Sequence, residues 1–232
     1  GGETLVLPFE ATDYDALPGV VENAIAWNGG VDFLINNAGV SQRSLALDTS
    51  FDVYRRIMEI DFFAPLRLTQ LVLPSMIERK SGRIVIISSV AGKVGAPLRT
   101  AYCAAKYACV GYFDALRAEI EAAYGVGVSV VLPGSVRTNV ALNALTGDGT
   151  ARGRTDANIE SGMAPEKAAA IILDGVAAGM REIPVAEGME LAALQMRAAN
   201  PEALFGFVAQ EGARLAVARQ AGEATDPAIV NS

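Results

Sequence analysis

Short apolar runs alternate along this chain with longer segments in which apolar residues recur at helical spacing. This alternation is typical of a parallel β-sheet whose strands are joined by crossover helices, the doubly wound, Rossmann-like α/β class. The apolar runs predict strands at 4–10, 31–37, 82–89, 126–132 and 181–188, and the helical spacing predicts helices at 13–27, 51–80 and 101–124.

The longest helical pattern, at 51–80, has a proline in its interior. Pro65 has no backbone N–H, and its ring collides with the preceding turn, so we expect a kink there. The helix would then run in two parts that meet beside Pro65.

A polar, glycine-rich stretch at 146–162 follows the end of a predicted strand. It is long for a loop inside a compact domain, and such loops are usually either substrate lids or partly disordered segments. Open parallel sheets bind their ligands beyond the carboxyl ends of their strands, so this position favours a lid.

The segment 188–232 is helical and apolar but is interrupted by charged residues and a proline. We expect it to be a helical extension of a single domain at 1–187. Three roles are open to it: it can cover a ligand pocket, extend an oligomer interface or rest on a membrane surface. Its low basic content makes membrane contact the least favoured of the three.

Composition narrows the class of protein further. A chain of 232 residues, 51% of them hydrophobic, is long enough to bury a sizeable core as one soluble domain. Its net charge of -7 leaves no basic stripe for phosphates, which argues against nucleic-acid partners. The sequence shows neither a membrane-spanning run nor a signal-peptide pattern, so we expect a cytoplasmic protein without firm membrane association.

The chain has no histidine and two cysteines, which excludes a histidine-based hydrolase triad and a zinc site of His and Cys ligands. Cys103 and Cys109 lie on different faces of one predicted helix and out of disulfide range, so we interpret both as small packing residues. We expect no metal site, and any acid or base must come from Tyr, Lys, Asp or Glu.

The predicted helix at 101–124 carries a tyrosine and a lysine four residues apart, Tyr102 and Lys106. Side chains at this spacing lie together on one face of a helix. A phenol titrates at about pH 10, but a nearby cation favours the phenolate and lowers that pKa, so such a tyrosine can exchange a proton with an alcohol oxygen. The pair alone is weak support for this chemistry, because it also occurs on ordinary alanine-rich helices.

Three predicted strands end in residues suited to a ligand site. Ser89 ends one strand, thirteen residues before Tyr102. The sequence NNAG at 36–39 ends a second, and PGSVRTN at 133–139, with the hydroxyl of Thr138, ends a third. Because the carboxyl ends of parallel strands converge on one crevice, these residues and the helix bearing Tyr102 can face one pocket.

Taken in order, NNAG, Ser89, YCAAK and PGSVRT closely resemble the short-chain dehydrogenase/reductase family, over residues 4 to about 180. The amino-acid sequence of residues 57–108 is most similar to the dehydrogenase/reductase member 7 branch of that family. The resemblance implies an NAD(P)-dependent oxidoreductase that interconverts a ketone or aldehyde and an alcohol by hydride transfer.

The resemblance also implies residue roles. Ser89 would hydrogen-bond the carbonyl oxygen, Tyr102 would be the general acid, or the base in reverse, and Lys106 would lower the pKa of Tyr102 and bind the nicotinamide ribose. The implied cofactor-binding residues are Glu10 and Ala11 beside the adenine, Asn37, Ala38 and Gly39 along the cofactor, Val136 and Thr138 at the nicotinamide amide, and Pro133, together with Tyr102 and Lys106.

The implied partners are a small carbonyl or alcohol substrate of apolar character and further copies of the chain. The helices at 51–80 and 101–124 are the family's usual pairing surfaces, which favours a homodimer or homotetramer. The member 7 branch favours NADP slightly over NAD. A catalytically silent relative that binds or regulates is the alternative, and an extended sugar-nucleotide epimerase is disfavoured because its substrate domain would need more chain.

Asp61 stands where the family has a catalytic asparagine. In the family, the main-chain carbonyl of that residue holds a water leading to the lysine, so an aspartate can serve if the helix bend survives. Its carboxylate would also stabilise Lys106 in the charged form. An acid that merely lies near a kink and an altered proton relay both remain open.

The family's TGxxxGxG loop is absent from the sequence. The resemblance implies that the chain opens at the family's third strand and lacks two βα units, roughly 50 to 60 residues. Those units supply the central strand and the helix N-terminus that binds pyrophosphate. A sheet without them would expose an apolar edge, so we expect an N-terminally incomplete domain.

Overall fold

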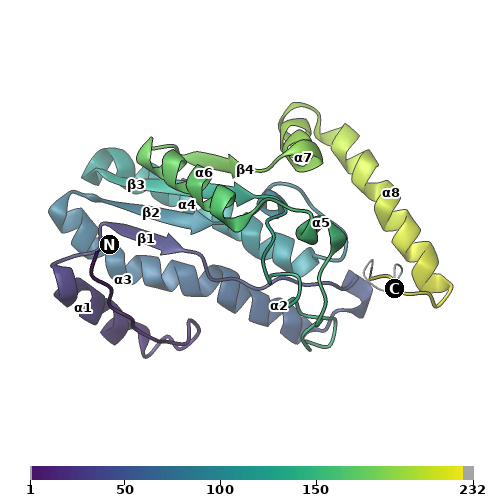
Figure 1. Cartoon of the computed structure of the whole chain (residues 1–232), viewed down its shortest axis with the longest axis horizontal. Helices are drawn as coiled ribbons and strands as arrows, with labels where there is room; N and C mark the ends of the chain where they lie inside the picture. The colour runs from purple at the N-terminus through teal and green to yellow at the C-terminus, as the bar shows by residue number, and fades with distance from the viewer. Residues whose placement is uncertain (1, 227–232) are drawn as a thin grey trace.

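Four parallel strands form the sheet within residues 2–226, the part of the chain that the computed structural model describes (Figure 1). They lie side by side in chain order: β1 (Phe33–Asn36), β2 (Gly82–Ile87), β3 (Val126–Pro133) and β4 (Glu182–Val185). Because every neighbouring pair is parallel, all four carboxyl ends lie at the same edge of the sheet. The strands predicted after residue 30 are thus confirmed.

Helices cover both faces of the sheet (Figure 1). One core packs on Phe113 and Met76, and the core on the opposite face packs on Val131 and Val176. Since both faces are covered, the central strands read as continuous apolar runs. The predicted α/β class is confirmed. The helices of the first face are α1 (Leu17–Asn28), α3 (Ala64–Arg79) and α4 (Thr100–Tyr124), and that of the second face is α6 (Pro165–Ala177).

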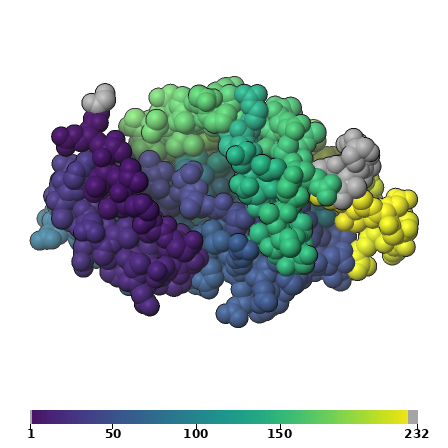
Figure 2. Space-filling view, turned by 60° about the horizontal axis from the view of Figure 1, so that its bottom comes forward, coloured from purple at the N-terminus to yellow at the C-terminus, as the bar shows by residue number. Residues whose placement is uncertain are grey.

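The chain ends in two helices, α7 (Gly188–Ala199) and α8 (Pro201–Gln220). Leu204 of α8 packs against Val90 and Val94, which follow β2. The N-terminal residues and α8 lie at opposite ends of the molecule (Figure 2). Within residues 2–226 no helix combines the length and the apolar character needed to cross a membrane.

The kink expected at Pro65 is a π-helical turn, η2 (Glu59–Phe63), between α2 (Phe51–Met58) and α3. Pro65 has no N–H to donate to the carbonyl of Asp61 four residues earlier, so the α-helical pattern is interrupted there. The Asp61 carbonyl instead accepts the thiol of Cys109 at 3.1 Å. The bend survives, and it presents Asp61 to α4.

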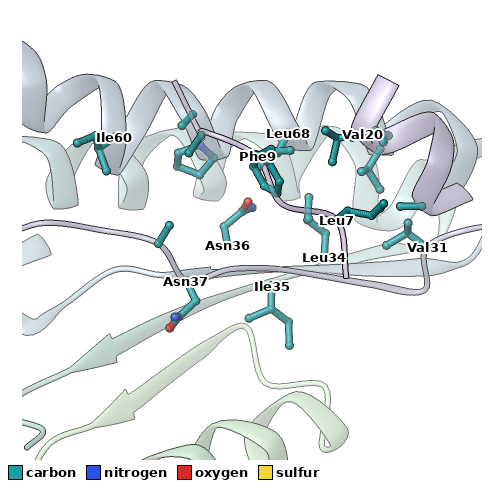
Figure 3. Close-up of a pocket in the computed structure, with 17 residues that line it drawn as sticks. Leu7, Phe9, Val20, Val31, Leu34, Ile35, Asn36, Asn37, Ile60 and Leu68 are labelled. Atoms are coloured by element: carbon teal, nitrogen blue, oxygen red, sulfur yellow. The ribbon is translucent and has the colours of Figure 1, made fainter. Parts of the chain in front are cut away.

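Residues 4–10 form no strand, so the strand predicted there is wrong. A strand requires a neighbour for its N–H and C=O groups, and this segment pairs with none of the four described strands. It crosses over β1 instead, where Leu7 and Phe9 close an apolar cavity of about 360 Å³ (Figure 3). On the strand itself, Phe33 and Ile35 remain exposed.

Buried ion pairs hold the glycine-rich stretch, which contains the short helix α5 (Ala157–Glu160), against the body of the protein. Asp156 accepts Nε of Arg43 at 2.8 Å and Nη2 at 2.6 Å, and it pairs with Arg152 at 2.7 Å. Arg152 donates in turn to Asp226 near the end of the described chain, at 2.7 Å. The stretch is thereby tied both to the segment after β1 and to the C-terminal region, and its role as a lid stays a prediction.

Two further short turns are η1 (Ala46–Asp48) and η3 (Val90–Gly92).

We expect Asp156→Asn to lower the free energy of unfolding by about 2 kcal/mol at neutral pH, because the amide keeps the shape but removes the counter-charge of Arg43. Burial alone would raise the pKa of Asp156, but the hydrogen bonds and charges of Arg43 and Arg152 hold it below its ordinary value of 3.8. The carboxylate therefore stabilises the fold above pH 3.8, and this contribution is lost as the pH falls through the folded-state pKa.

Urea unfolding at about pH 7 and at about pH 3, which lies below the ordinary pKa of 3.8, tests this expectation. The matched control is Asp114→Asn, which removes the half-exposed partner of Arg117 and is expected to cost no more than about 0.5 kcal/mol. Equal losses in the two variants, or a loss in Asp156→Asn that does not shrink in acid, would contradict a stabilising role of the buried network.

Candidate active site

The carboxyl ends of the strands open into a cavity of about 460 Å³. Its walls come from the segments after β1, β2 and β3 and from α4 and α6. Residues far apart in the sequence are therefore brought to one pocket, as strand-end convergence predicts. The predicted site residues that line it are Asn37, Gly39, Ser89, Tyr102, Lys106, Pro133, Val136 and Thr138.

Lys106 is almost fully buried, and three groups surround its ammonium. Nζ donates to the Ile87 carbonyl at 3.1 Å, pairs with Asp61 Oδ2 at 3.3 Å and lies 5.6 Å from the centre of the Tyr102 ring. Burial alone would lower the pKa of Lys106, but the negative charges of Asp61 and of a Tyr102 phenolate raise it above its ordinary value. Lys106 is thus a cation held between a carboxylate and the predicted proton donor.

Asp61 is fully buried in η2. Its Oδ1 accepts the backbone N–H of Val40 at 2.8 Å, and its Oδ2 faces Lys106. Burial raises the pKa of Asp61 above its ordinary value, against the attraction of Lys106 and the Val40 hydrogen bond. The carboxylate therefore joins the segment after β1 to the lysine of α4.

Gly39 packs closely against this ion pair. A Cβ atom added to it would lie 3.3 Å from both Lys106 Nζ and Asp61 Oδ2. A side chain here would press on the two charged groups, so the glycine of NNAG lets the backbone run directly against them.

Ser89 follows β2, and its side chain links the end of β2 to the end of β3. Its hydroxyl donates to the Pro133 carbonyl at 3.2 Å and accepts the N–H of Ala91 at 3.1 Å. The bond to Pro133 is longer than the usual range for a hydroxyl donor, so it can be exchanged for a stronger bond to a ligand oxygen.

Some predicted cofactor residues lie outside this cavity. Ala11 and Ala38 line the apolar cavity beside residues 4–11, which shares Asn37 with the larger one (Figure 3). Glu10 is exposed and accepts the hydroxyl of Thr12 at 3.1 Å. The structure therefore does not bring Glu10 to either cavity.

Sequence reasoning missed the wall that α6 contributes. Four of its residues line the cavity and, together with Ile159 of α5, make that wall largely apolar. Their spacing of three, four and seven residues is the pattern of one helix face, and it was available in the sequence as a signal. These residues are Pro165, Ala168, Ala169 and Ile172.

Comparison with known proteins adds an independent observation. A sequence profile described as short chain dehydrogenase matches residues 1–148, well over half of the chain. The chain belongs to the short-chain dehydrogenase/reductase family. Members of this family are, at family level, NAD(P)-dependent oxidoreductases.

Similar relatives carry the name of the branch indicated by the sequence. The chain is 41% identical over 201 residues to "Dehydrogenase/reductase SDR family member 7B" of Xenopus tropicalis, covering 87% of this chain and 65% of that protein. It is 44% identical over 182 residues to the Danio rerio protein of the same name, covering 78% of this chain and 59% of that protein. The resemblance to the member 7 branch is confirmed, although the chain spans less than two thirds of the length of these relatives.

Solved structures support the fold. The chain resembles a short chain dehydrogenase/reductase from Burkholderia phymatum, solved in complex with NAD, with a TM-score of 0.76 and 21% identity over 87% of this chain and 77% of that one. A short chain dehydrogenase from Burkholderia cenocepacia in complex with NADP gives a TM-score of 0.73 at 23% identity, with the same coverage. At this level of identity the likeness shows the fold alone.

The residues of the larger cavity fit the nicotinamide end of such a cofactor. An ammonium has three hydrogens, and the two acceptors recorded for Lys106 within residues 2–226 are the Ile87 carbonyl and Asp61. A ribose and a carboxamide suit three groups here: the remaining N–H of Lys106, the backbone at Gly39, which carries no side chain, and the hydroxyl of Thr138.

Proposed function

We propose that the protein is an NAD(P)-dependent oxidoreductase that interconverts a ketone or aldehyde and an alcohol, with Tyr102 as general acid and base. The observation that carries this proposal is the buried Lys106 ammonium, 5.6 Å from the Tyr102 ring centre, in the same cavity as the Ser89 hydroxyl. A buried cation beside a phenol, at the carboxyl edge of a parallel sheet, favours proton transfer by that phenol.

The chain's own residues exchange a proton with the substrate oxygen and hydrogen-bond it. A bound nicotinamide cofactor supplies or accepts the hydride at the carbon. In the reductive direction, Tyr102 donates its phenolic proton to the oxygen that becomes negative, and Ser89 donates a hydrogen bond to the same oxygen. Lys106 stabilises the phenolate that remains on Tyr102 and binds the ribose. In the oxidative direction, that phenolate takes the alcohol proton.

The apolar wall of the cavity supports an apolar substrate. Ile87, Val136 and Ile159 line it together with the face of α6. Burying apolar carbon against these side chains is favourable by roughly 25 cal/mol per Å². We therefore propose a hydrophobic carbonyl or alcohol as the substrate class.

The test uses protein expressed from its complete gene. Oxidation of NADPH and of NADH is followed by absorbance against a panel of aldehydes and ketones of increasing apolar size. We expect carbonyl-dependent oxidation, faster with NADPH. If the protein binds the cofactor but neither reduces any carbonyl nor oxidises any alcohol of the panel, it is a catalytically silent binding protein instead.

Asp61 is proposed to influence proton transfer by Tyr102 through the charge of Lys106. Its negative charge offsets part of the effect of the Lys106 cation, so Asp61→Asn is expected to shift the pH profile of kcat for alcohol oxidation to lower pH. In that variant, the phenolate of Tyr102 becomes the counter-charge of Lys106. The measurement is the pH dependence of kcat for oxidation, with Asp52→Asn, an exposed acid of α2, as control. Overlapping curves for the parent and Asp61→Asn would leave the carboxylate without a special role.

A further inference from the structure

A carboxylate from the C-terminal helices reaches the edge of the candidate active site. Glu190, in the first turn of α7, accepts two hydrogen bonds from Ser135, from the backbone N–H at 2.7 Å and from the hydroxyl at 2.7 Å. Ser135 belongs to the turn that follows β3, and its neighbours Gly134 and Val136 line the cavity. One side chain thus fixes both the backbone and the hydroxyl of this turn.

Gly134 shows how closely the carboxylate is packed. A Cβ atom added to it would lie 2.1 Å from Glu190 Oε2 and 3.3 Å from the Ala186 Cβ. Any side chain here would displace the carboxylate and break its bond to the Ser135 N–H. The absence of a side chain at Gly134 is therefore a condition for the contact with Glu190.

The same turn is joined to the glycine-rich stretch. The Ser135 hydroxyl accepts Asn158 Nδ2 of α5 at 2.9 Å, and the Ser135 carbonyl accepts the Met163 N–H at 2.9 Å. Two residues further along the chain, the Arg137 N–H donates to the Met163 carbonyl at 2.9 Å. Ser135 therefore lies between the C-terminal extension on one side and the predicted lid on the other.

We propose that Glu190 is a positioning residue, whose carboxylate sets the place of the Gly134–Val136 turn and, through the Ser135 hydroxyl, that of α5. This inference rests on the proposed function for its catalytic consequence, because the turn carries Val136 and leads to Thr138 beside the nicotinamide. Displacement of a reacting group by about 1 Å can cost about a hundredfold in rate. Glu190 then shapes the site from outside the cavity, since none of the described residues of α7 and α8 lines it.

Amide hydrogen exchange in the absence of cofactor tests the positioning by itself. Glu190→Ala is expected to speed exchange at least about tenfold in 134–136 and in 157–160. Ser135→Ala keeps the backbone N–H bond but loses the hydroxyl, so it should speed exchange in 157–160 alone. Glu202→Ala, which removes an exposed acid from the first turn of α8, is the matched control. Unchanged exchange in Glu190→Ala would overturn the proposal.

Steady-state kinetics then measure the catalytic consequence. Glu190→Ala is expected to lower kcat about 10- to 100-fold with less than about threefold change in cofactor Kd. Glu190→Gln retains a carbonyl acceptor for the Ser135 N–H and should recover most of kcat. Gly134→Ala should reproduce Glu190→Ala, and the double variant should not be additive. A lowered Tm with unchanged kcat would reduce Glu190 to a structural role. If the parent protein shows no activity, the proposed function fails, whereas hydrogen exchange still decides whether Glu190 holds the turn.

Discussion

Tyr102→Phe is expected to lower kcat for carbonyl reduction by about a thousandfold. The substitution removes a single oxygen and leaves the aromatic ring, so the contact of the ring with the Lys106 ammonium persists. The substrate oxygen then loses its proton donor, while Ser89 can still hydrogen-bond it. Because the cofactor and the substrate keep their other contacts, KM and cofactor Kd should change little.

The control is Tyr107→Phe, on the same helix but exposed. Stopped-flow or steady-state rates with the best carbonyl of the panel measure kcat, and quenching of protein fluorescence measures cofactor binding. A Tyr102→Phe variant that retains more than about a tenth of kcat would assign the proton transfer to another group. A loss of cofactor binding in parallel with kcat would instead show that the phenol positions the cofactor.

Most strands could be predicted from the sequence because an apolar run is a local feature of the chain. One predicted strand was wrong because a strand also needs a pairing neighbour, which can lie far away in the sequence. The runs at 82–89 and 126–132 are apolar on both faces, which only a strand covered by helices on both sides requires. The run at 4–10 is also rich in apolar residues, but a strand exists only where a neighbour supplies its hydrogen bonds. No described strand lies beside it; Leu7 and Phe9 line a cavity beside β1, while Val6 remains exposed.

The sequence predicts the parts of the site that lie at strand ends. It does not predict the contacts between residues that are far apart in the sequence. The position of Ser89 and of NNAG follows from parallel strands ending at one edge. The contact of Glu190 with Ser135 joins residues 55 positions apart, from a helix and a turn, and no spacing in the sequence indicates it. The sequence also left the role of Asp61 open, since only the π-helical turn before Pro65 directs its carboxylate to Lys106.

The second large effect is expected for Lys106→Met, which should lower the free energy of unfolding by about 3 to 5 kcal/mol. Methionine fills the space of the lysine stem and suits a helix, so packing is largely kept. The variant leaves the carboxylate of Asp61, which is 0% exposed, without its cation. A buried carboxylate without a counter-charge is among the most unfavourable groups in a folded protein.

The pH dependence gives this loss a distinct signature. In the parent, the raised pKa of Lys106 contributes stability that is present below 10.5 and is lost as the pH rises through its folded-state pKa. Burial already raises the folded-state pKa of Asp61 above 3.8 in the parent, and Lys106→Met removes the attraction of Lys106 that opposes it, so the native state keeps a proton that the unfolded chain loses over a wider pH range. Stability of the variant should therefore fall as the pH rises above 3.8 until the folded-state pKa of Asp61 is passed.

Urea unfolding of the parent, Lys106→Met and the double variant Lys106→Met/Asp61→Asn, at about pH 5 and about pH 8, separates charge from packing. We expect Lys106→Met to lose more stability at the higher pH. The double variant should regain most of it and lose the dependence, because an amide does not titrate in this range. If the double variant is as unstable as the single one, Lys106 stabilises the fold by packing rather than as the counter-charge of Asp61. The cation beside Tyr102 would then have no electrostatic partner in η2, and the proposed tuning of the phenol through Asp61 would fail with it.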